Sequence, residues 1–208
     1  MQMKQTIKTV ALLIIISGNL NSELPAQTKS KSMDRITLGG GCFWCTETIF
    51  NELNGVVSVI SGYSGGEVIN PSYKEICTGR TGHAEVVEVE FDPSVISFTE
   101  LLEVFFATHD PTTLNRQGAD VGTQYRSAIF YRNQNQKEIA ESIIDRLNRE
   151  NIFGKPVVTE LSPWKNFFRA EDYHQNYFSN NTGQPYCQFV IIPKVEKFRK
   201  IFRDKIKP

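Results

Sequence analysis

Three glycines precede a cysteine and two aromatic residues in the segment GGGCFWC at residues 39–45. The flanking residues predict a short strand over 35–38 and a helix over 46–53, where apolar side chains repeat at helical spacing. The glycines allow a sharp turn and a close approach to a ligand. A cysteine at a helix start faces unpaired N–H groups and the positive end of the helix dipole, which favour the thiolate. We therefore expect Cys42 to be a nucleophile at a strand-to-helix turn.

The size and charge of the chain exclude several classes of protein. Its 208 residues, 40% of them hydrophobic, are enough for one well-packed domain but not for two large ones. Basic and acidic residues are balanced at 23 each. The charge therefore gives no reason to expect binding to nucleic acid or to an anionic surface.

The first 26 residues have the layout of a secretory signal peptide. Lys4 and Lys8 precede an apolar run at 10–16, which small and polar residues follow. This run is far shorter than the ~20 residues that span a bilayer, so no stable membrane insertion is expected. The sequence predicts a signal peptide over 1–26, with its cleavage site left open, a linker over 27–33 and one domain over 34–208. We expect that domain to be exported, to the periplasm or another extracytoplasmic compartment.

Strands and helices alternate along this domain. Strands are expected at 35–38, 55–63, 84–91, 127–131 and 157–161, and helices at 46–53, 97–108, 136–151 and 195–205. This order predicts an α+β fold, a two-layer ferredoxin-like sandwich of the βαββαβ type with a C-terminal helix. Long polar and aromatic segments at 64–83, 108–126 and 162–188 separate the elements, and long ordered loops usually carry function.

Each long segment contains, or is followed closely by, a side chain that suits thiol chemistry. Glu85 lies at the start of a strand, where burial beside aromatic rings would raise the pKa of its carboxyl and make it an acid near neutral pH. Asp120 and Tyr125 could orient a polar group of a ligand, and His174 could act as a base or orient another residue. Taken alone, each also has an ordinary structural explanation.

Taken together, these segments resemble the A-type peptide methionine sulfoxide reductases. The resemblance runs from about residue 34 to 193 and includes GGCFW at 40–44, NPxY at 70–73, TGHAE at 81–85, HDPT at 109–112, RQGxDxGTQYRSAI at 116–129 and AEDYHQ at 170–175. Separated motifs in a fixed order are far more specific than one C-x-x-C pair.

The resemblance implies a reaction and a set of site residues. Members of the family reduce methionine S-sulfoxide, in proteins or free, to methionine. By resemblance, Cys42 attacks the sulfoxide sulfur and Glu85 protonates its oxygen. The substrate-binding residues would be Phe43, Trp44, Tyr73, Asp120, Tyr125 and His174. The sulfenic acid left on Cys42 would form a disulfide with a second thiol, and a thioredoxin-like reductant would reduce it. No metal or organic cofactor is implied, and a monomer is expected.

Two cysteines could resolve the sulfenic acid of Cys42. Cys45 has the spacing of redox C-x-x-C pairs. Cys187 falls where many members of the family carry a resolving cysteine on a mobile tail. Here, however, an apolar run of β character follows at 188–193, which indicates a packed tail. We therefore favour Cys45 and interpret Cys77 as a packed thiol.

Two other functions remain open at this point. A general thiol-disulfide oxidoreductase using Cys42 and Cys45 would exchange disulfides without needing Glu85 or the tyrosines. A zinc-binding module using all four cysteines would lack the second closely spaced pair that structural zinc sites contain.

Overall fold

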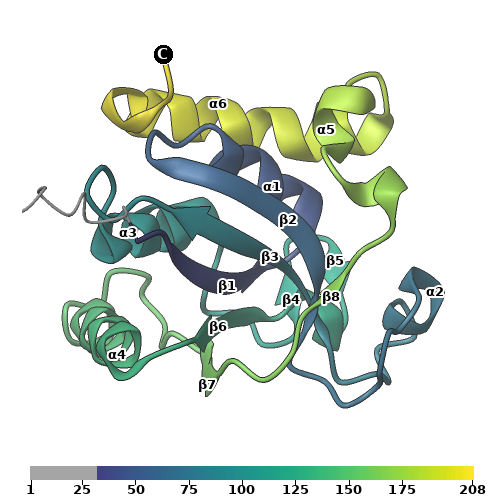
Figure 1. The fold of residues 1–208 in the computed structure, drawn as a ribbon, viewed down its shortest axis with the longest axis horizontal. Coiled ribbons are helices and arrows are strands. Elements are labelled where there is room, and N and C mark those ends of the chain that lie inside the picture. The colour runs from purple at the N-terminus through teal and green to yellow at the C-terminus, as the bar shows by residue number, and fades with distance from the viewer. Residues whose placement is uncertain (1–31) are drawn as a thin grey trace, which may run out of the picture. The chain divides into compact units, whose positions relative to one another are not determined.

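A six-stranded mixed sheet forms the centre of the domain (Figure 1). The computed structural model describes residues 32–208, and the predicted signal peptide and most of the predicted linker lie outside the described residues. The strand order is β7-β6-β1-β3-β2-β8, antiparallel throughout except for the parallel pair β6 and β7. The strands are β1 (Asp34–Gly40), β2 (Val56–Ser64), β3 (Ala84–Phe91), β6 (Ser127–Tyr131), β7 (Glu160–Pro163) and β8 (Phe168–Arg169). A separate short hairpin pairs β4 (Arg116–Gln117) with β5 (Asp120–Val121).

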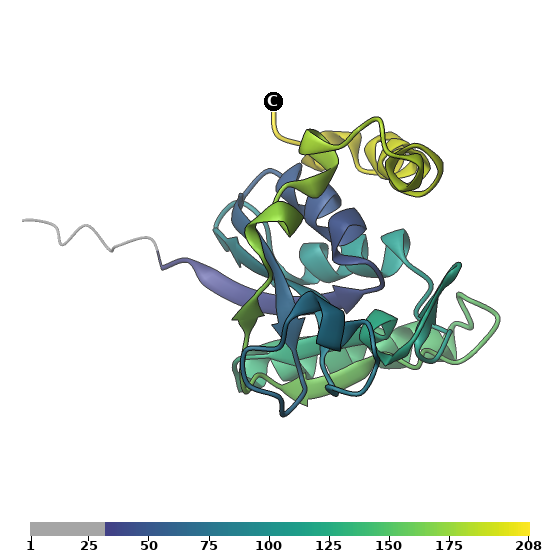
Figure 2. The same ribbon diagram turned by 90° about the vertical axis from the view of Figure 1, so that its right-hand side faces the viewer.

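The helices build the layers around this sheet. They are α1 (Phe43–Asn51), α2 (Tyr73–Ile76), α3 (Phe98–Thr108), α4 (Gln134–Arg149), α5 (Tyr177–Asn180) and α6 (Ile192–Ile201). Helix α1 packs on β1, β2 and β3, and α6 packs against α1 and α3 (Figures 1 and 2). Helix α4 contacts α3, β6 and β7. Among residues 32–208, no helix has the length and apolar character that crossing a membrane requires.

The register of β3 decides where Glu85 lies. Val87, Val89 and Phe91 are fully buried in the main core beneath the helices. Because side chains alternate along a strand, Glu85 points to the same face. A one-residue slip would move these apolar side chains to the opposite face, where Glu88 and Glu90 are only partly buried, so their burial fixes the position of the carboxyl as well.

The fifth predicted strand begins later than expected. Strand β7 covers 160–163 rather than 157–161. The N–H of Val157 donates to Asn148 Oδ1 at 2.8 Å, and the N–H of Val158 donates to the Pro111 carbonyl at 2.8 Å. These two residues therefore bond to loops and a helix end instead of joining the sheet.

The prediction of β character at 188–193 was wrong. Residues Cys187–Ile191 form a π-helical segment that continues into α6, which begins at Ile192 instead of 195 and ends at Ile201. Cys187, Ile191, Val195 and Phe198 are all buried. Their spacing of three or four residues is helical, and the helix buries this stripe against the domain.

Candidate active site

Cys42 is the residue immediately before α1, at the turn that the glycines make. Its backbone is extended (φ −56°, ψ 123°), and its carbonyl accepts a 3.2 Å hydrogen bond from the N–H of Cys45. Gly41 has φ +89°, and a Cβ there would lie 2.5 Å from Gln117 Cγ. Only glycine fits this position, so the turn that aims Cys42 depends on it.

The carboxyl of Glu85 lies against the same helix start. Its Oε2 accepts a 3.1 Å hydrogen bond from the backbone N–H of Phe43, and its side chain is 1% exposed. Burial raises the pKa of Glu85 to about 8, although the Phe43 hydrogen bond opposes the shift. Oε1 is buried and has no hydrogen-bond partner among residues 32–208. The carboxyl is therefore protonated at neutral pH and has one oxygen free for a ligand.

Three of the four cysteines gather at this helix. Cys42, Cys45 and Cys187 are buried in the main core, Cys77 is exposed, and all four thiols are free. Burial raises the pKa of the Cys42 thiol well above its ordinary value, against our expectation that the helix start alone would favour a thiolate. A hydrogen bond from Cys42 lowers the pKa of Cys45. Burial and then the charge of Cys45 raise the pKa of Cys187. Cys45 therefore lies close to both Cys42 and Cys187.

Two tyrosines flank the Glu85 carboxyl. Tyr73, at the start of α2, and Tyr125, in the turn before β6, are both half-buried. Their pKa values are raised by burial first and then by the charge of Glu85. The two phenol groups therefore lie near the carboxyl, although the three side chains come from three separate segments of the chain.

Asp120 has a partner that the sequence did not single out. The hydroxyl of Tyr186 donates a 2.8 Å hydrogen bond to Asp120 Oδ2, and Tyr186 also lies next to Cys42. The ring of Tyr186 meets Trp44 edge-on, at 5.8 Å between centroids. Tyr186 is thus a site residue that we missed. Its position next to Cys187 in the sequence was the only signal for it.

Trp44 forms the apolar wall with a second residue that we missed. The rings of Trp44 and Tyr177 are stacked, with their centroids 3.6 Å apart and their planes at 7°. Phe43 is buried behind them, against Tyr63 and His174. Tyr177 lies just beyond the AEDYHQ motif and begins α5, which brings it over α1.

His174 supports this wall from behind. Its side chain is 1% exposed, its Nδ1 accepts a 3.1 Å hydrogen bond from Trp44 Nε1, and its ring contacts Tyr73 at 4.4 Å. Burial lowers its pKa, so the imidazole is neutral. The structure thus places His174 where it orients Trp44 and Tyr73.

Glu171 fixes the other side of the Tyr73 loop. Its carboxylate accepts hydrogen bonds from the Tyr63 hydroxyl at 2.8 Å and from the backbone N–H of Tyr73 at 2.9 Å. It belongs to the AEDYHQ motif, but the sequence did not assign it a role.

Arg126 connects the loops that carry the polar groups of the site. Its guanidinium donates to the carbonyls of Gly82 and Thr123, each at 3.0 Å, and to Glu160 Oε2 at 2.7 Å. Gly82 precedes Glu85 in the TGHAE motif, and Thr123 opens the turn that carries Tyr125. One side chain therefore holds both segments against β7.

The structure thus brings together the candidate nucleophile, a second thiol, a protonated carboxyl, two phenols and an apolar wall. Among residues 32–208, no group of three or more His, Cys, Asp or Glu side chains could hold a metal ion. A mixed α/β fold with a buried thiol facing a neutral acid defines a site suited to thiol-based redox chemistry.

Comparison with known proteins gives the family. The sequence model of the family described as "Peptide methionine sulfoxide reductase" matches residues 34–206. The peptide methionine sulfoxide reductase MsrA of Sulfolobus acidocaldarius is 59% identical over 173 residues, which cover 83% of this chain and 97% of the relative. The MsrA of Deinococcus radiodurans is 53% identical over 193 residues, which cover 90% of this chain and 94% of the relative. The chain belongs to the peptide methionine sulfoxide reductase family.

Solved structures agree with this assignment. Reduced Mxr1 from Saccharomyces cerevisiae has a TM-score of 0.69 at 37% identity, covering 74% of this chain and 89% of that chain. Mxr1 in complex with Trx2 has a TM-score of 0.50 at 28% identity, and the match covers 71% of this chain and 86% of that chain. The mixed sheet and its helices are therefore the fold of this family.

Proposed function

We propose that this protein reduces methionine S-sulfoxide to methionine, with Cys42 as the nucleophile and Glu85 as the general acid. The observation that carries the proposal is the buried, protonated Glu85, which the N–H of Phe43 holds one residue after Cys42 and whose Oε1 has no hydrogen-bond partner in the described part of the chain. A sulfoxide is a poor electrophile until its oxygen is protonated. The thiol must therefore reach the sulfur while the acid reaches the oxygen of the same sulfoxide group. Cys42 and Glu85 both lie at the start of α1.

The first step forms a bond between Cys42 Sγ and the substrate sulfur. Glu85 gives its proton to the sulfoxide oxygen and recovers a proton from the Cys42 thiol. Tyr73 and Tyr125 donate hydrogen bonds to the same oxygen. Transfer of the hydroxyl to Cys42 then releases methionine and leaves a sulfenic acid. The buried thiol with its raised pKa is consistent with this exchange, because proton and nucleophile are delivered together.

The second step forms a disulfide. We propose that Cys45 attacks the sulfenic acid and that the hydroxyl leaves as water. Its lowered pKa and its hydrogen bond to Cys42 support this role. Over the two steps, two thiols and one sulfoxide become one disulfide, one methionine and one water molecule.

The wall of the site suits one epimer of the chiral sulfur. Trp44 and Tyr177 present apolar faces to a methyl group, while Glu85, Tyr73 and Tyr125 bind the oxygen on the other side. Oxidised proteins and peptides, and free methionine sulfoxide, would be the substrates. Asp120 and Tyr186 complete the polar side.

A dithiol protein of the thioredoxin class is the proposed reductant, as the solved complex of yeast Mxr1 with Trx2 suggests. We further propose that the protein is a monomer and that residues 1–26 direct its export. It would then repair oxidised proteins outside the cytoplasm, with an exported electron donor. A reporter fused to residues 1–30 that stays cytoplasmic would contradict export, and size-exclusion chromatography tests the monomer.

We also infer a ferredoxin-like unit within the sheet. The order β6-β1-β3-β2, with α1 after β1 and α3 after β3, matches the βαββαβ plan, and β7 and β8 extend its edges.

The test supplies the purified chain with a dithiol reductant and with each epimer of a methionine sulfoxide peptide. We expect turnover of the S epimer alone and none in Cys42→Ser. Disulfide exchange without turnover of either epimer would instead support a general thiol-disulfide oxidoreductase.

A further inference from the structure

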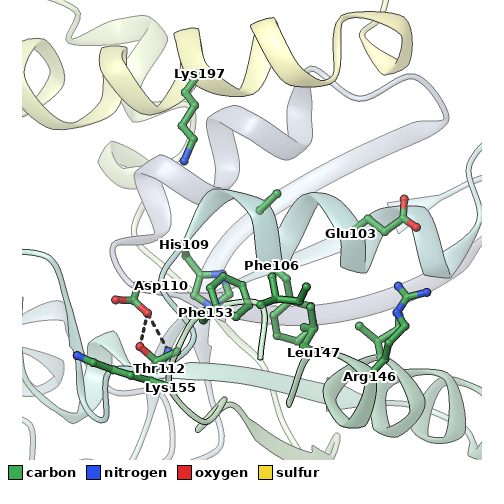
Figure 3. Close-up of a pocket in the computed structure, with 13 residues that line it drawn as sticks. Glu103, Phe106, His109, Asp110, Thr112, Arg146, Leu147, Phe153, Lys155 and Lys197 are labelled. Atoms are coloured by element: carbon green, nitrogen blue, oxygen red, sulfur yellow. Dashed lines mark hydrogen bonds between the residues drawn. The ribbon is translucent and has the colours of Figure 1, made fainter. Parts of the chain in front are cut away.

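A hollow lies apart from the cysteines, between α3, α4 and the loop that follows α4 (Figure 3). Its volume is ≈ 500 Å³, within the range of about 300–1,000 Å³ typical of small-molecule sites. Its apolar side chains are Phe106, Ile143, Leu147, Ile152 and Phe153. None of the residues that we assign to the reductase reaction lines it.

A smaller hollow continues this one towards α6. It measures ≈ 270 Å³ and shares Ala107, His109, Asp110 and Lys197 with the first. Lys194, one turn before Lys197 on α6, also lines it. The two hollows therefore form one elongated site with an apolar end and an end beneath α6.

Four cations line the two hollows: Arg146, Lys155, Lys194 and Lys197. Within residues 32–208, none of these side chains makes an ion pair or a hydrogen bond. Elsewhere in the same domain Arg126, Arg132 and Arg199 each pair with a glutamate. Figure 3 shows Lys197 reaching from α6 towards His109, with Lys155 and Arg146 on opposite sides of the aromatic floor.

The acidic groups of the site do not cancel this charge. Asp110 Oδ1 accepts hydrogen bonds from the N–H and the hydroxyl of Thr112, at 2.9 and 2.7 Å, and the charge of Lys155 also acts on this carboxylate. Asp110 and Glu103 are the only acids among the lining residues, against four cations. Burial lowers the pKa of His109 to about 4, so its ring is neutral, and both ring nitrogens are within 2.7 Å of a partner oxygen. The lining is therefore net cationic beside an apolar floor.

We propose that this elongated site binds a small amphiphilic anion, a carboxylate with an aliphatic chain. The chain would cover Phe106, Leu147 and Phe153, and the carboxylate would lie between the lysines of α6 and Lys155. A cation would be repelled, and a small polar anion would leave the floor exposed to water. This proposal does not depend on the reductase activity, because binding is measured without turnover.

The test is calorimetric titration of the purified full chain with octanoate at low salt. We expect saturable binding that weakens as salt is added and strengthens about fourfold for each added CH₂ from hexanoate to decanoate. Acetate and octylammonium should each bind at least about tenfold more weakly than octanoate.

Charge reversal locates the site. Lys155→Glu with Lys197→Glu should weaken octanoate binding at least about tenfold, whereas Lys165→Glu with Lys200→Glu makes the same charge change on exposed lysines away from both hollows. Circular dichroism checks that both variants fold. Equal loss in the two variants, equal binding of octylammonium, or no saturable binding of octanoate would each overturn the proposal.

Discussion

The backbone N–H of Phe43 donates a 3.1 Å hydrogen bond to Glu85 Oε2 and so ties the start of α1 to the start of β3. Cys42 is the preceding residue, so the hydrogen bond sets the position of the proposed acid relative to the proposed nucleophile. It also leaves Oε1 buried and without a hydrogen-bond partner among residues 32–208, as the oxygen that could protonate a sulfoxide.

The pH dependence of the reduction rate should reflect the pKa of Glu85. Burial raises that pKa to about 8, so activity should decline as pH rises through this value and the acid loses its proton. Glu85→Gln should lower kcat by roughly 10²–10⁴-fold and abolish this decline. Steady-state rates from pH 6 to 10 give both quantities. A variant with near-normal kcat would remove Glu85 from the mechanism.

The same carboxyl should make stability depend on pH. Its pKa is about 8 in the folded protein against 4.5 for an ordinary glutamate, so between these values the folded state holds a proton that the unfolded state has lost. The free energy of unfolding should therefore fall by up to roughly 1.4 kcal/mol per pH unit over this window and level off above it. Urea titrations of wild type and Glu85→Gln should show a shallower slope for the variant. Exposed Glu196→Gln, as control, should retain the wild-type slope.

The choice of resolving cysteine can be read from single turnovers. Cys45→Ser should release about one methionine per enzyme and then stop when a thioredoxin-type protein is the only reductant, because the sulfenic acid has no partner. Cys187→Ser should continue to turn over. The reverse pattern would assign the role to Cys187, which is also buried in this cluster.

Arg126 should act as a positioning residue. Lysine retains the charge but cannot donate to Gly82, Thr123 and Glu160 together, so the Glu85 and Tyr125 segments lose their common support. We expect Arg126→Lys to lower kcat and kcat/KM equally, by roughly tenfold, with KM unchanged. Arg169→Lys, at an exposed ion pair with Asp172, is the control. A change confined to thermal stability would indicate a purely structural role.

Gly41 should tolerate no side chain. Gly41→Ala combines a backbone at φ +89° with a Cβ 2.5 Å from Gln117 Cγ. We expect a loss of at least about 2 kcal/mol in unfolding free energy. Gly154→Ala separates the two causes, because Gly154 has φ +67° with no atom within 4 Å of the added Cβ. Its loss should be about 1 kcal/mol. Similar losses of unfolding free energy at both positions would mean that the Gln117 side chain moves away from the added Cβ at little cost.

Sequence alone determined most of the local elements and the chemical groups of this protein. The glycine turn, the strand at 84–91 and the helix opened by the Ser97–Glu100 capping box follow from local patterns, and the structure confirms them. The motifs likewise gave the family, which the comparisons confirm. Local signals suffice here because turn chemistry and amphipathic spacing act over a few residues.

Only the tertiary structure decided which groups meet. Tyr186 and Tyr177 approach Trp44 from a segment more than a hundred residues away, and no local pattern marks that contact. The segment at 187–191 is helical because Cys187 and Ile191 are buried with α6, although its residues favour strands. The raised pKa of Glu85 depends on burial by distant side chains. Contacts and desolvation are properties of the packed chain, so the acid at this site could be named from sequence but its protonation could not.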